Sequence, residues 1–348
     1  MMADNKVRQA FSARELAICL SHYDLGIISS IEEFARGSRR APKVVIDCQR
    51  GRFLFKRRAK GKDDLAKVAF THQIQLTLAG QNFPLPHLLG TRDENDSMLV
   101  WESSIYEMFE YITGSGYDGS LDATFHSGRI LGLYHKLLVD FSSDYKPPTG
   151  SYHDAPAIQQ AIQNTISSLP MDSRPSAEVL TETVEHLKGS YQSCADEVNK
   201  LGLKNWQAQI VHGDWHPGNM LFREQNIVAV IDYDAARLQQ RVIDLANGAL
   251  QFSILGGADD PAKWPAYLDR TRFKRFMRGY DSVNVVSVAE LKAVPFLMCE
   301  AMTAEAVLPI AATGSFGRLD GFGFLQMVSR KVKWILEHME ELGNVLED

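Results

Sequence analysis

The chain has 348 residues, of which 45% are hydrophobic and 23% are charged, so it is long enough to form two lobes around a large core. Its formal net charge of −6 does not favour binding to nucleic acid or to an anionic membrane surface. The four cysteines lie far apart and form no C-x-x-C pair, so we expect free thiols in a cytoplasmic protein. Residues 1–13 contain no apolar signal core, and no run of about 18 uncharged apolar residues predicts a membrane-spanning helix.

The N-terminal third predicts a five-stranded antiparallel sheet with one inserted helix. Ser12 and Glu15 have the spacing of a capping box, which begins a short helix before the sheet. Strands are expected where β-branched and aromatic residues lie between turn residues. The expected strands are Ile27–Phe34, Lys43–Cys48, Gly51–Lys56, Ser97–Glu102 and Ile105–Ile112, and the inserted helix is Leu65–Ala79.

After residue 112 the sequence becomes mostly helical. Helices are expected at Leu121–Phe141, Pro156–Ser168 and Ala177–Leu201, with short loops rich in proline, glycine and serine between them. The C-terminal third is again mostly helical. We therefore predict an α+β protein with a small antiparallel β-sheet lobe at residues 1–108, a connecting segment at 109–114 and a larger, mostly helical lobe at 115–348.

A predicted β-hairpin lies in the most informative part of the chain, residues 211–234. Its two apolar runs, Met220–Phe222 and Ile227–Ile231, flank a polar turn. If the turn is centred on Gln225 and Asn226, the residues that precede and follow the two runs meet at the open end of the hairpin.

Three polar residues at that end could support metal-assisted chemistry. Asn219 and Asp232 are expected to lie opposite each other, with Cβ atoms about 5 Å apart. An amide oxygen and a carboxylate suit Mg²⁺, which takes few protein ligands and completes its shell with phosphates and water. Asp214 lies five residues before Asn219 on the same loop, where a carboxylate could orient an attacking hydroxyl.

The spacing His212-x-Asp214-x-x-x-x-Asn219, followed by Ile231-Asp232-Tyr233-Asp234, resembles the signature of the aminoglycoside phosphotransferase superfamily, which includes choline kinases and type II homoserine kinases. It is also similar to the protein-kinase pattern H-R-D-x-x-x-x-N plus D-F-G. The resemblance implies a bilobal protein-kinase-like fold. It further implies a phosphotransferase that uses ATP and Mg²⁺ to phosphorylate a hydroxyl of a small metabolite, such as an amino alcohol, an amino acid or a sugar.

The resemblance also implies roles for residues of the larger lobe. Asp214 is expected to be the catalytic base, and Asn219 and Asp232 are expected to hold Mg²⁺. Asp244 matches the buried aspartate that braces the catalytic loop, and His212 is expected to support the same loop.

In the small lobe, the resemblance assigns nucleotide binding. Lys56, at the end of the third strand, matches the phosphate-binding lysine of the family. The backbone of Glu110 to Ile112 matches the hinge segment that binds adenine. Without nucleotide we expect Lys56 to contact Asp232. Two further expectations concern its neighbours on the strand, namely that Phe53 and Phe55 pack against the inserted helix and that Arg57 and Arg58 lie outside the cleft.

Two features depart from the family pattern. The loop Gly37–Pro42 contains one glycine where a glycine-rich phosphate loop is expected, and Arg39 or Arg40 could compensate by charge. The inserted helix has no glutamate to pair with Lys56, so either Gln73 takes its place or the pairing is lost.

Other functions and the acceptor site remain open from the sequence. A catalytically degenerate kinase fold with a binding or structural role fits the two departures, although the motif residues are all present. A metal-dependent phosphoesterase could use His212, Asp214 and His216, but it needs more ligands than the sequence offers. Glu300 and Glu305, on a helical stretch, either hold a cationic amine of the acceptor or form a solvated face.

Overall fold

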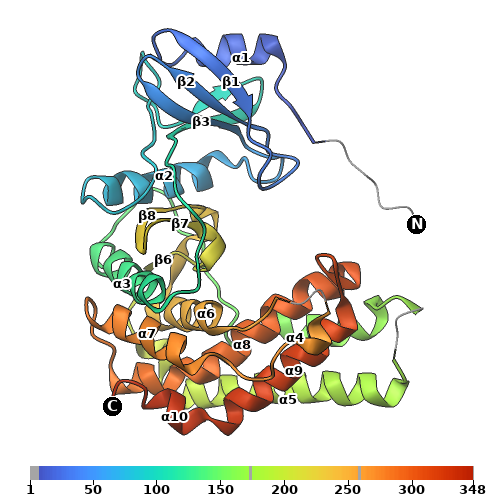
Figure 1. Ribbon diagram of the computed structural model, residues 1–348. Coiled ribbons are helices and arrows are strands. Elements are labelled where there is room, and N and C mark those ends of the chain that lie inside the picture. The colour runs from blue at the N-terminus through green and yellow to red at the C-terminus, as the bar shows by residue number, and fades with distance from the viewer. Residues whose placement is uncertain (1–7, 172–174, 258–259, 348) are drawn as a thin grey trace.

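The computed structural model describes residues 8–171, 175–257 and 260–347, which form two lobes with the β-sheet at one end of the molecule and most helices at the other (Figure 1). The small lobe contains one five-stranded sheet, and every strand pair in it is antiparallel. Its strands, in spatial order, are β1 (Ile28–Glu33), β2 (Lys43–Cys48), β3 (Gly51–Arg57), β5 (Ser104–Glu110) and β4 (Leu99–Trp101). The predicted α+β bilobal architecture is confirmed.

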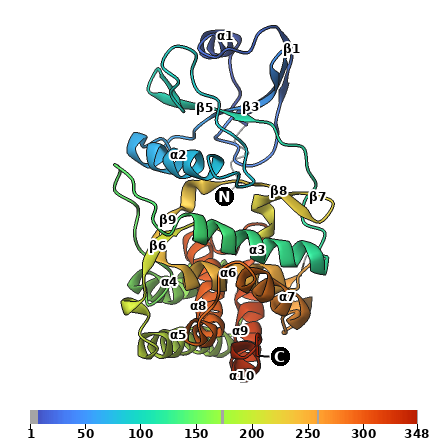
Figure 2. The same ribbon diagram turned by 90° about the vertical axis from the view of Figure 1, so that its left-hand side faces the viewer.

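Two helices accompany the sheet. Helix α1 (Ala13–Leu20) begins with the predicted capping box, in which Glu15 N donates to Ser12 Oγ at 3.1 Å and Ser12 N donates to Glu15 Oε2 at 3.3 Å. Helix α2 (Leu65–Ala79) is the predicted inserted helix. It lies between the sheet and a hairpin of the larger lobe formed by β7 (Met220–Arg223) and β8 (Asn226–Val230), as both views of the ribbon show (Figures 1 and 2).

The two faces of the sheet belong to different environments. Phe55 of β3 is fully buried in a small core shared with α1, where it stacks on Phe11 and Tyr106. Phe53 packs against the same core. The apolar face of α2 belongs instead to the large core of the helical lobe. The expectation that Phe53 and Phe55 pack against α2 is therefore wrong, because α2 buries its apolar side chains against the other lobe.

The larger lobe is built around α8 (Val288–Thr313), which packs against five other described helices. This described helix is long and apolar enough to cross a membrane, but 78% of its most apolar stretch is buried inside the protein, as in the central helix of a folded core. The other helices are α3 (Leu121–Leu137), α4 (Pro156–Ser168), α5 (Ala177–Lys200), α6 (Arg241–Ser253), α7 (Arg270–Asp281), α9 (Gly321–Glu337) and α10 (Met339–Gly343). Three short strand pairs complete it, β6 (Ala208–Val211) with β9 (Arg237–Gln240), β7 (Met220–Arg223) with β8 (Asn226–Val230), and β10 (Ser315–Phe316) with β11 (Leu319–Asp320).

Helices α3 and α7 cross with their backbones in direct contact. A Cβ atom on Gly128 would lie 2.0 Å from the carbonyl oxygen of Phe276, and one on Gly279 would lie 2.0 Å from that of Phe125. No side chain fits at either position, because interiors are close-packed and backbone cannot move aside cheaply. This crossing fixes α3, which carries His135 to the catalytic loop.

Candidate active site

The loop between β6 and β7 carries the predicted catalytic residues, and a buried carboxylate holds its first turn. The backbone N–H groups of His212 and Gly213 donate to Asp244 Oδ2 and Oδ1, at 2.9 and 3.0 Å. His135 of α3 contacts Asp244 Oδ2 through Nε2 at 3.1 Å. Burial raises the pKa of Asp244, but the hydrogen bond and charge of His135, with the His212 contacts, outweigh burial and leave this pKa below its usual value. Asp244 is thus ionised, and its carboxylate holds the loop by accepting these hydrogen bonds.

The sharp bend of the loop requires glycine at position 213. Gly213 has φ of +76°, and a Cβ there would lie 2.5 Å from the carbonyl oxygen of Ala235. Next to it, the imidazole of His212 is fully buried, and burial lowers its pKa, so the ring is neutral at pH 7. His212 Nε2 lies 3.3 Å from Ile231 O, which links the loop to the strand before Asp232.

Asp214 is held by two neighbours on its own loop. Asn219 Nδ2 donates to Asp214 O and to Asp214 Oδ2, both at 2.9 Å, and His216 Nε2 lies 3.6 Å from Oδ2. Burial raises the pKa of Asp214, but the hydrogen bonds and charge of His216 and Asn219 outweigh it and lower the pKa below its ordinary value. Asp214 is therefore ionised at neutral pH and able to accept a hydrogen bond from a hydroxyl.

The β7–β8 hairpin has a different register from the predicted one. Its turn comes one residue earlier, a bulge interrupts the pairing at Leu221 and Phe222, and Ile231 N donates to Asn219 O at 2.9 Å. The expected direct opposition of Asn219 and Asp232 is therefore wrong by one residue. Asp232 follows at the same open end of the hairpin, with φ of +64° in the left-handed region that aspartate tolerates better than most residues.

The donor set at this end of the hairpin fits Mg²⁺. The amide nitrogen of Asn219 is committed to Asp214, which leaves its Oδ1 as the atom free to bind a cation, and among the described residues this oxygen accepts no hydrogen bond. Asp232 offers a carboxylate from the neighbouring strand end. One carboxylate and one amide oxygen are the few hard ligands that Mg²⁺ takes when phosphates and water supply the rest.

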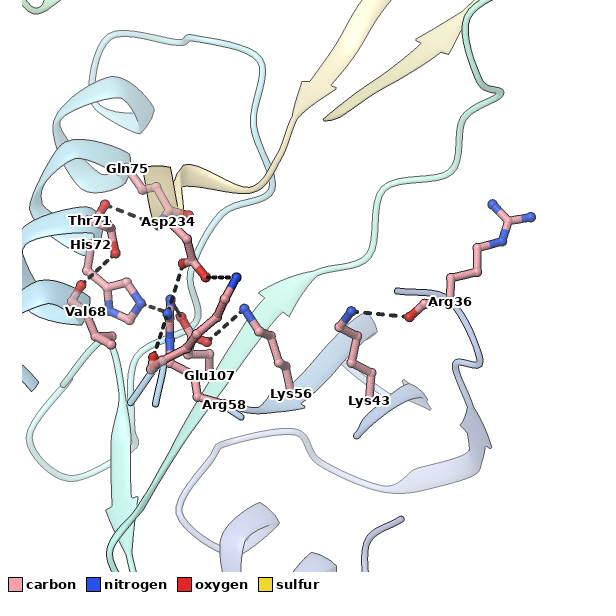
Figure 3. A network of polar contacts seen from close by, with 11 residues as sticks. Arg36, Lys43, Lys56, Arg58, Val68, Thr71, His72, Gln75, Glu107 and Asp234 are labelled. Carbon is pink, nitrogen blue, oxygen red and sulfur yellow. Dashed lines mark hydrogen bonds and ion pairs between the residues drawn. The ribbon is translucent and has the colours of Figure 1, made fainter. Parts of the chain in front are cut away.

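In the small lobe, three side chains surround a buried carboxylate that the sequence did not single out (Figure 3). Glu107 of β5 is fully buried, and its Oε2 lies 3.4 Å from Lys56 Nζ of β3. Its Oε1 lies 2.8 Å from Arg58 Nη2 and 2.8 Å from His72 Nε2 of α2. Arg58 Nη1 extends to Asp234 Oδ1 of the larger lobe at 2.9 Å. Burial acts to raise the pKa of Glu107, but Lys56, His72 and Arg58 together hold it far below its usual range.

Glu107 supplies the carboxylate that α2 lacks. Lys56 and Glu107 are directly paired residues of adjacent antiparallel strands, so their side chains share one face of the sheet. Gln73 does not take the place of the missing glutamate, because its Oε1 accepts a hydrogen bond from Ser143. The sequence signal for this pair was an acidic residue, Glu107, in the middle of the otherwise apolar run Ile105–Phe109.

The Lys56 network corrects two further expectations. Lys56 forms its ion pair with Glu107 and not with Asp232. Arg58 is buried and joins the two lobes, whereas it was expected outside the cleft. Arg57 does lie away from this network, because its Nη1 is 2.6 Å from Glu15 near the N-terminal helix. Neighbouring residues on a strand point to opposite faces, which separates Arg57 from both of its neighbours.

In the connecting segment, two backbone N–H groups are engaged and that of Ile112 is available. Glu110 N donates to His87 O at 2.8 Å and Tyr111 N donates to Arg52 O at 2.9 Å. Within the described parts of the chain, the N–H of Ile112 donates to no group.

Residues 30–283, more than half of the chain, match the phosphotransferase enzyme family. The chain belongs to this family. It has the fold of a structure described as a microcompartment-associated aminopropanol kinase, with a TM-score of 0.69, 12% identity and coverage of 95% of this chain and 99% of the other. An aminoglycoside phosphotransferase from Alicyclobacillus acidocaldarius matches with a TM-score of 0.65 and 15% identity, over 93% of this chain and 93% of the other. Amicoumacin kinase, solved with AMP-PNP, Ca²⁺ and Ami, matches with a TM-score of 0.65 and 12% identity, over 94% of each chain. A comparison with curated proteins found no significant match.

The phosphotransferase is thus an enzyme that acts on an alcohol group of its acceptor. Its described residues, 8–171, 175–257 and 260–347, contain no group of three or more His, Cys, Asp or Glu side chains placed to hold a metal ion. A two-metal phosphoesterase needs such a group, so this alternative gains no support.

Two acidic residues of α8 have different environments in this phosphotransferase. Glu300 is fully buried, where it contacts His153 Nδ1 at 3.0 Å and accepts from Asp154 N at 3.0 Å, so it forms neither a solvated face nor an acceptor contact. Glu305 remains accessible to solvent, and Gln251 Nε2 donates to its Oε2 at 2.6 Å. Although the residue as a whole is exposed, the surrounding protein displaces part of the water around its carboxyl, and this, together with the negative charge of Asp214, raises the pKa of Glu305 to about 7.

Proposed function

We propose that this phosphotransferase transfers the γ-phosphoryl group of ATP, in the presence of Mg²⁺, to a hydroxyl of a small metabolite that carries an amine. The observation that carries the proposal is the ion pair of Arg58 with Asp234, which ties the strand bearing Lys56 to the segment bearing Asp232. This tie between the lobes supports a phosphate-binding role for Lys56 and a metal-binding role for Asp232 at one site, as phosphoryl transfer needs.

The nucleotide is held by both lobes in this proposal. Lys56, fixed by Glu107, binds the α- and β-phosphates, and the backbone of Glu110 and Ile112 binds adenine through a carbonyl oxygen and a free N–H group. Asn219 Oδ1 and Asp232 hold Mg²⁺, which supplies positive charge to the phosphate oxygens.

Asp214 acts on the acceptor. As an ionised carboxylate fixed by Asn219, it accepts the hydrogen bond of the attacking hydroxyl. It takes the hydroxyl proton as the oxygen bonds to the γ-phosphorus and the bond from that phosphorus to the bridging oxygen of the β-phosphate breaks, which releases ADP. Asp244 and His212 contribute by holding the loop, through contacts made before any substrate is present.

Glu305 supports the choice of an amine-bearing acceptor. Its carboxyl is accessible, lies close enough to Asp214 to sense its charge, and is costly to ionise in this environment. A cationic group beside Glu305 would favour the ionised carboxylate and would place a nearby hydroxyl of the same molecule toward Asp214. We propose Glu305 as the group that binds this amine.

The degenerate-kinase alternative rests on the glycine-poor loop and on the absent helix glutamate. The Lys56–Glu107 pair removes the second reason, since a strand residue performs the pairing.

An ATP-consumption screen of the purified protein against small alcohols, amino alcohols, amino acids and sugars tests the proposal. We expect turnover that depends on Mg²⁺ and is highest with a hydroxylated amine. Glu305→Gln should raise the KM for that acceptor and leave the KM for ATP unchanged. A protein that binds no ATP with Mg²⁺, or consumes none with any acceptor, would support the degenerate reading.

A further inference from the structure

A second lysine lies beside Lys56, on the face of the sheet that contacts α2 and the larger lobe. Lys43 begins β2 and is the direct partner of Lys56 in the β2–β3 pairing. Directly opposed residues of antiparallel strands point to the same face, and Figure 3 shows the two ammonium groups extending in the same direction. Lys43 is half-buried, so its position is not that of an ordinary surface lysine.

The pairing of two lysines is electrostatically unfavourable without an anion. Like charges directly opposite each other on a sheet destabilise it. Lys56 has Glu107 as its counterion, whereas Lys43 forms no ion pair with any residue in the described part of the chain. Its Nζ donates to the carbonyl oxygen of Arg36 at 3.3 Å. Burial lowers the pKa of Lys43, and the charge of Lys56 lowers it further, while Asp232 across the cleft opposes both.

The loop before β2 is shaped around this ammonium. Gly37, the one glycine of the loop, has φ of +77°, and a Cβ at this position would lie 2.7 Å from Lys43 Nζ. The loop therefore lies against the ammonium group. In a glycine-rich phosphate loop, backbone N–H groups provide the positive potential at this place. In this loop a side-chain cation lies against the backbone, while Arg39 and Arg40 are exposed.

We propose that Lys43 is a second phosphate-binding residue, which binds the triphosphate of ATP from β2 while Lys56 binds it from β3. The two lysines form a clamp whose missing counterion is the nucleotide polyphosphate, and Lys43 compensates for the scarcity of glycine in the loop. This inference rests on the proposed function, because it takes ATP as the ligand of the cleft.

Binding measurements on the full-length protein in the presence of Mg²⁺ test the clamp. The affinities for ATP and for adenosine are measured for the wild type, Lys43→Ala, Lys43→Arg and Lys60→Ala. Lys60 is a suitable control, because it is a basic residue of the same lobe whose side chain is 71% exposed and pairs with Asp63. Adenosine has no phosphate, so its affinity, measured by ligand-observed NMR, reports only whether the base site is intact.

Lys43→Ala should weaken ATP binding by about tenfold or more, as expected for a lost charge-assisted hydrogen bond. Its adenosine affinity should not change, Lys43→Arg should restore part of the ATP affinity, and Lys60→Ala should match the wild type. An unchanged ATP affinity in Lys43→Ala overturns the clamp, as does an equal loss for ATP and adenosine, which would indicate a structural role. If the wild type itself binds no ATP, the proposed function fails, and the clamp fails with it.

Discussion

Glu107→Gln is the substitution that most directly tests how the lysine site is built. It removes one negative charge at a fully buried position that contacts Lys56, Arg58 and His72. Arg58 keeps Asp234 as a partner, but Lys56 loses its only ion pair within the described residues. Removing one partner of a buried ion pair costs about 3–5 kcal/mol, because the remaining charge is left uncompensated.

The stability loss should depend on pH in a defined direction. The pKa of Glu107 is depressed in the folded protein, so its contribution is present above its ordinary pKa of 4.5 and is lost as the pH falls below that value toward the folded-state pKa. In urea unfolding, the free-energy difference between wild type and Glu107→Gln should be about 3 kcal/mol or more at pH 7. It should shrink as the pH is lowered below about 4.5.

The same variant should use ATP poorly. Without its carboxylate partner Lys56 is no longer held in place, and we expect the KM for ATP to rise roughly tenfold, as for the loss of a charged hydrogen bond. Glu33→Gln is the matched control, since Glu33 is an exposed carboxylate on an edge strand of the same sheet. A Glu107→Gln protein with wild-type stability at pH 7 and an unchanged KM for ATP would refute the reasoning.

Three further predictions concern Lys56, Gly279 and Glu305. Lys56→Ala should raise the KM for ATP at least about tenfold. Arg57→Ala should leave this KM unchanged, because Arg57 pairs with Glu15 on the other face of the sheet. Equal effects of the two substitutions in a kinetic assay would contradict this placement. Gly279→Ala should lower the unfolding free energy by about 2 kcal/mol or more, while Gly189→Ala, whose added Cβ meets no atom within 4 Å, should be neutral or slightly stabilising in the same denaturation experiment. The pKa of Glu305 is raised to about 7 from an ordinary 4.5, so ionising this carboxyl lowers the stability of the fold as the pH rises through this range. Glu305→Gln should therefore increase the melting temperature at pH 8 but not below pH 4.5. An equal effect at both pH values would disprove the shift.

The elements of the fold could largely be predicted from local signals. The capping box of Ser12 and Glu15, the β-branched run of β2 and the apolar spacing of α2 each specify local backbone structure, and each element is present. What α2 packs against could not be predicted in the same way. The periodicity of its apolar residues predicts a helix with one buried face, but it does not specify which lobe covers that face. Only the tertiary structure shows that this face packs into the core of the larger lobe.

The site shows the same limit. The motif brought Asp214 and Asn219 onto one loop, but the hairpin register depended on a bulge at Leu221 and Phe222 that has no clear sequence signal. The partner of Lys56 was sought on the helix, where the family pattern places it. Strand pairing brings Glu107 beside Lys56, and such pairing across a long sequence separation cannot be obtained from local periodicity.

The central claim, that this protein is a phosphotransferase whose base is Asp214, is tested most directly by Asp214→Asn. The affinity for ATP with Mg²⁺ and the rate of phosphoryl transfer to the best acceptor of the screen are measured on the same preparation. Asp214 acts on the acceptor hydroxyl, so we predict nearly unchanged nucleotide affinity and a rate at least about a hundredfold lower, the low end for a general base. A folded Asp214→Asn protein that binds ATP and transfers phosphate at close to the wild-type rate would contradict the claim.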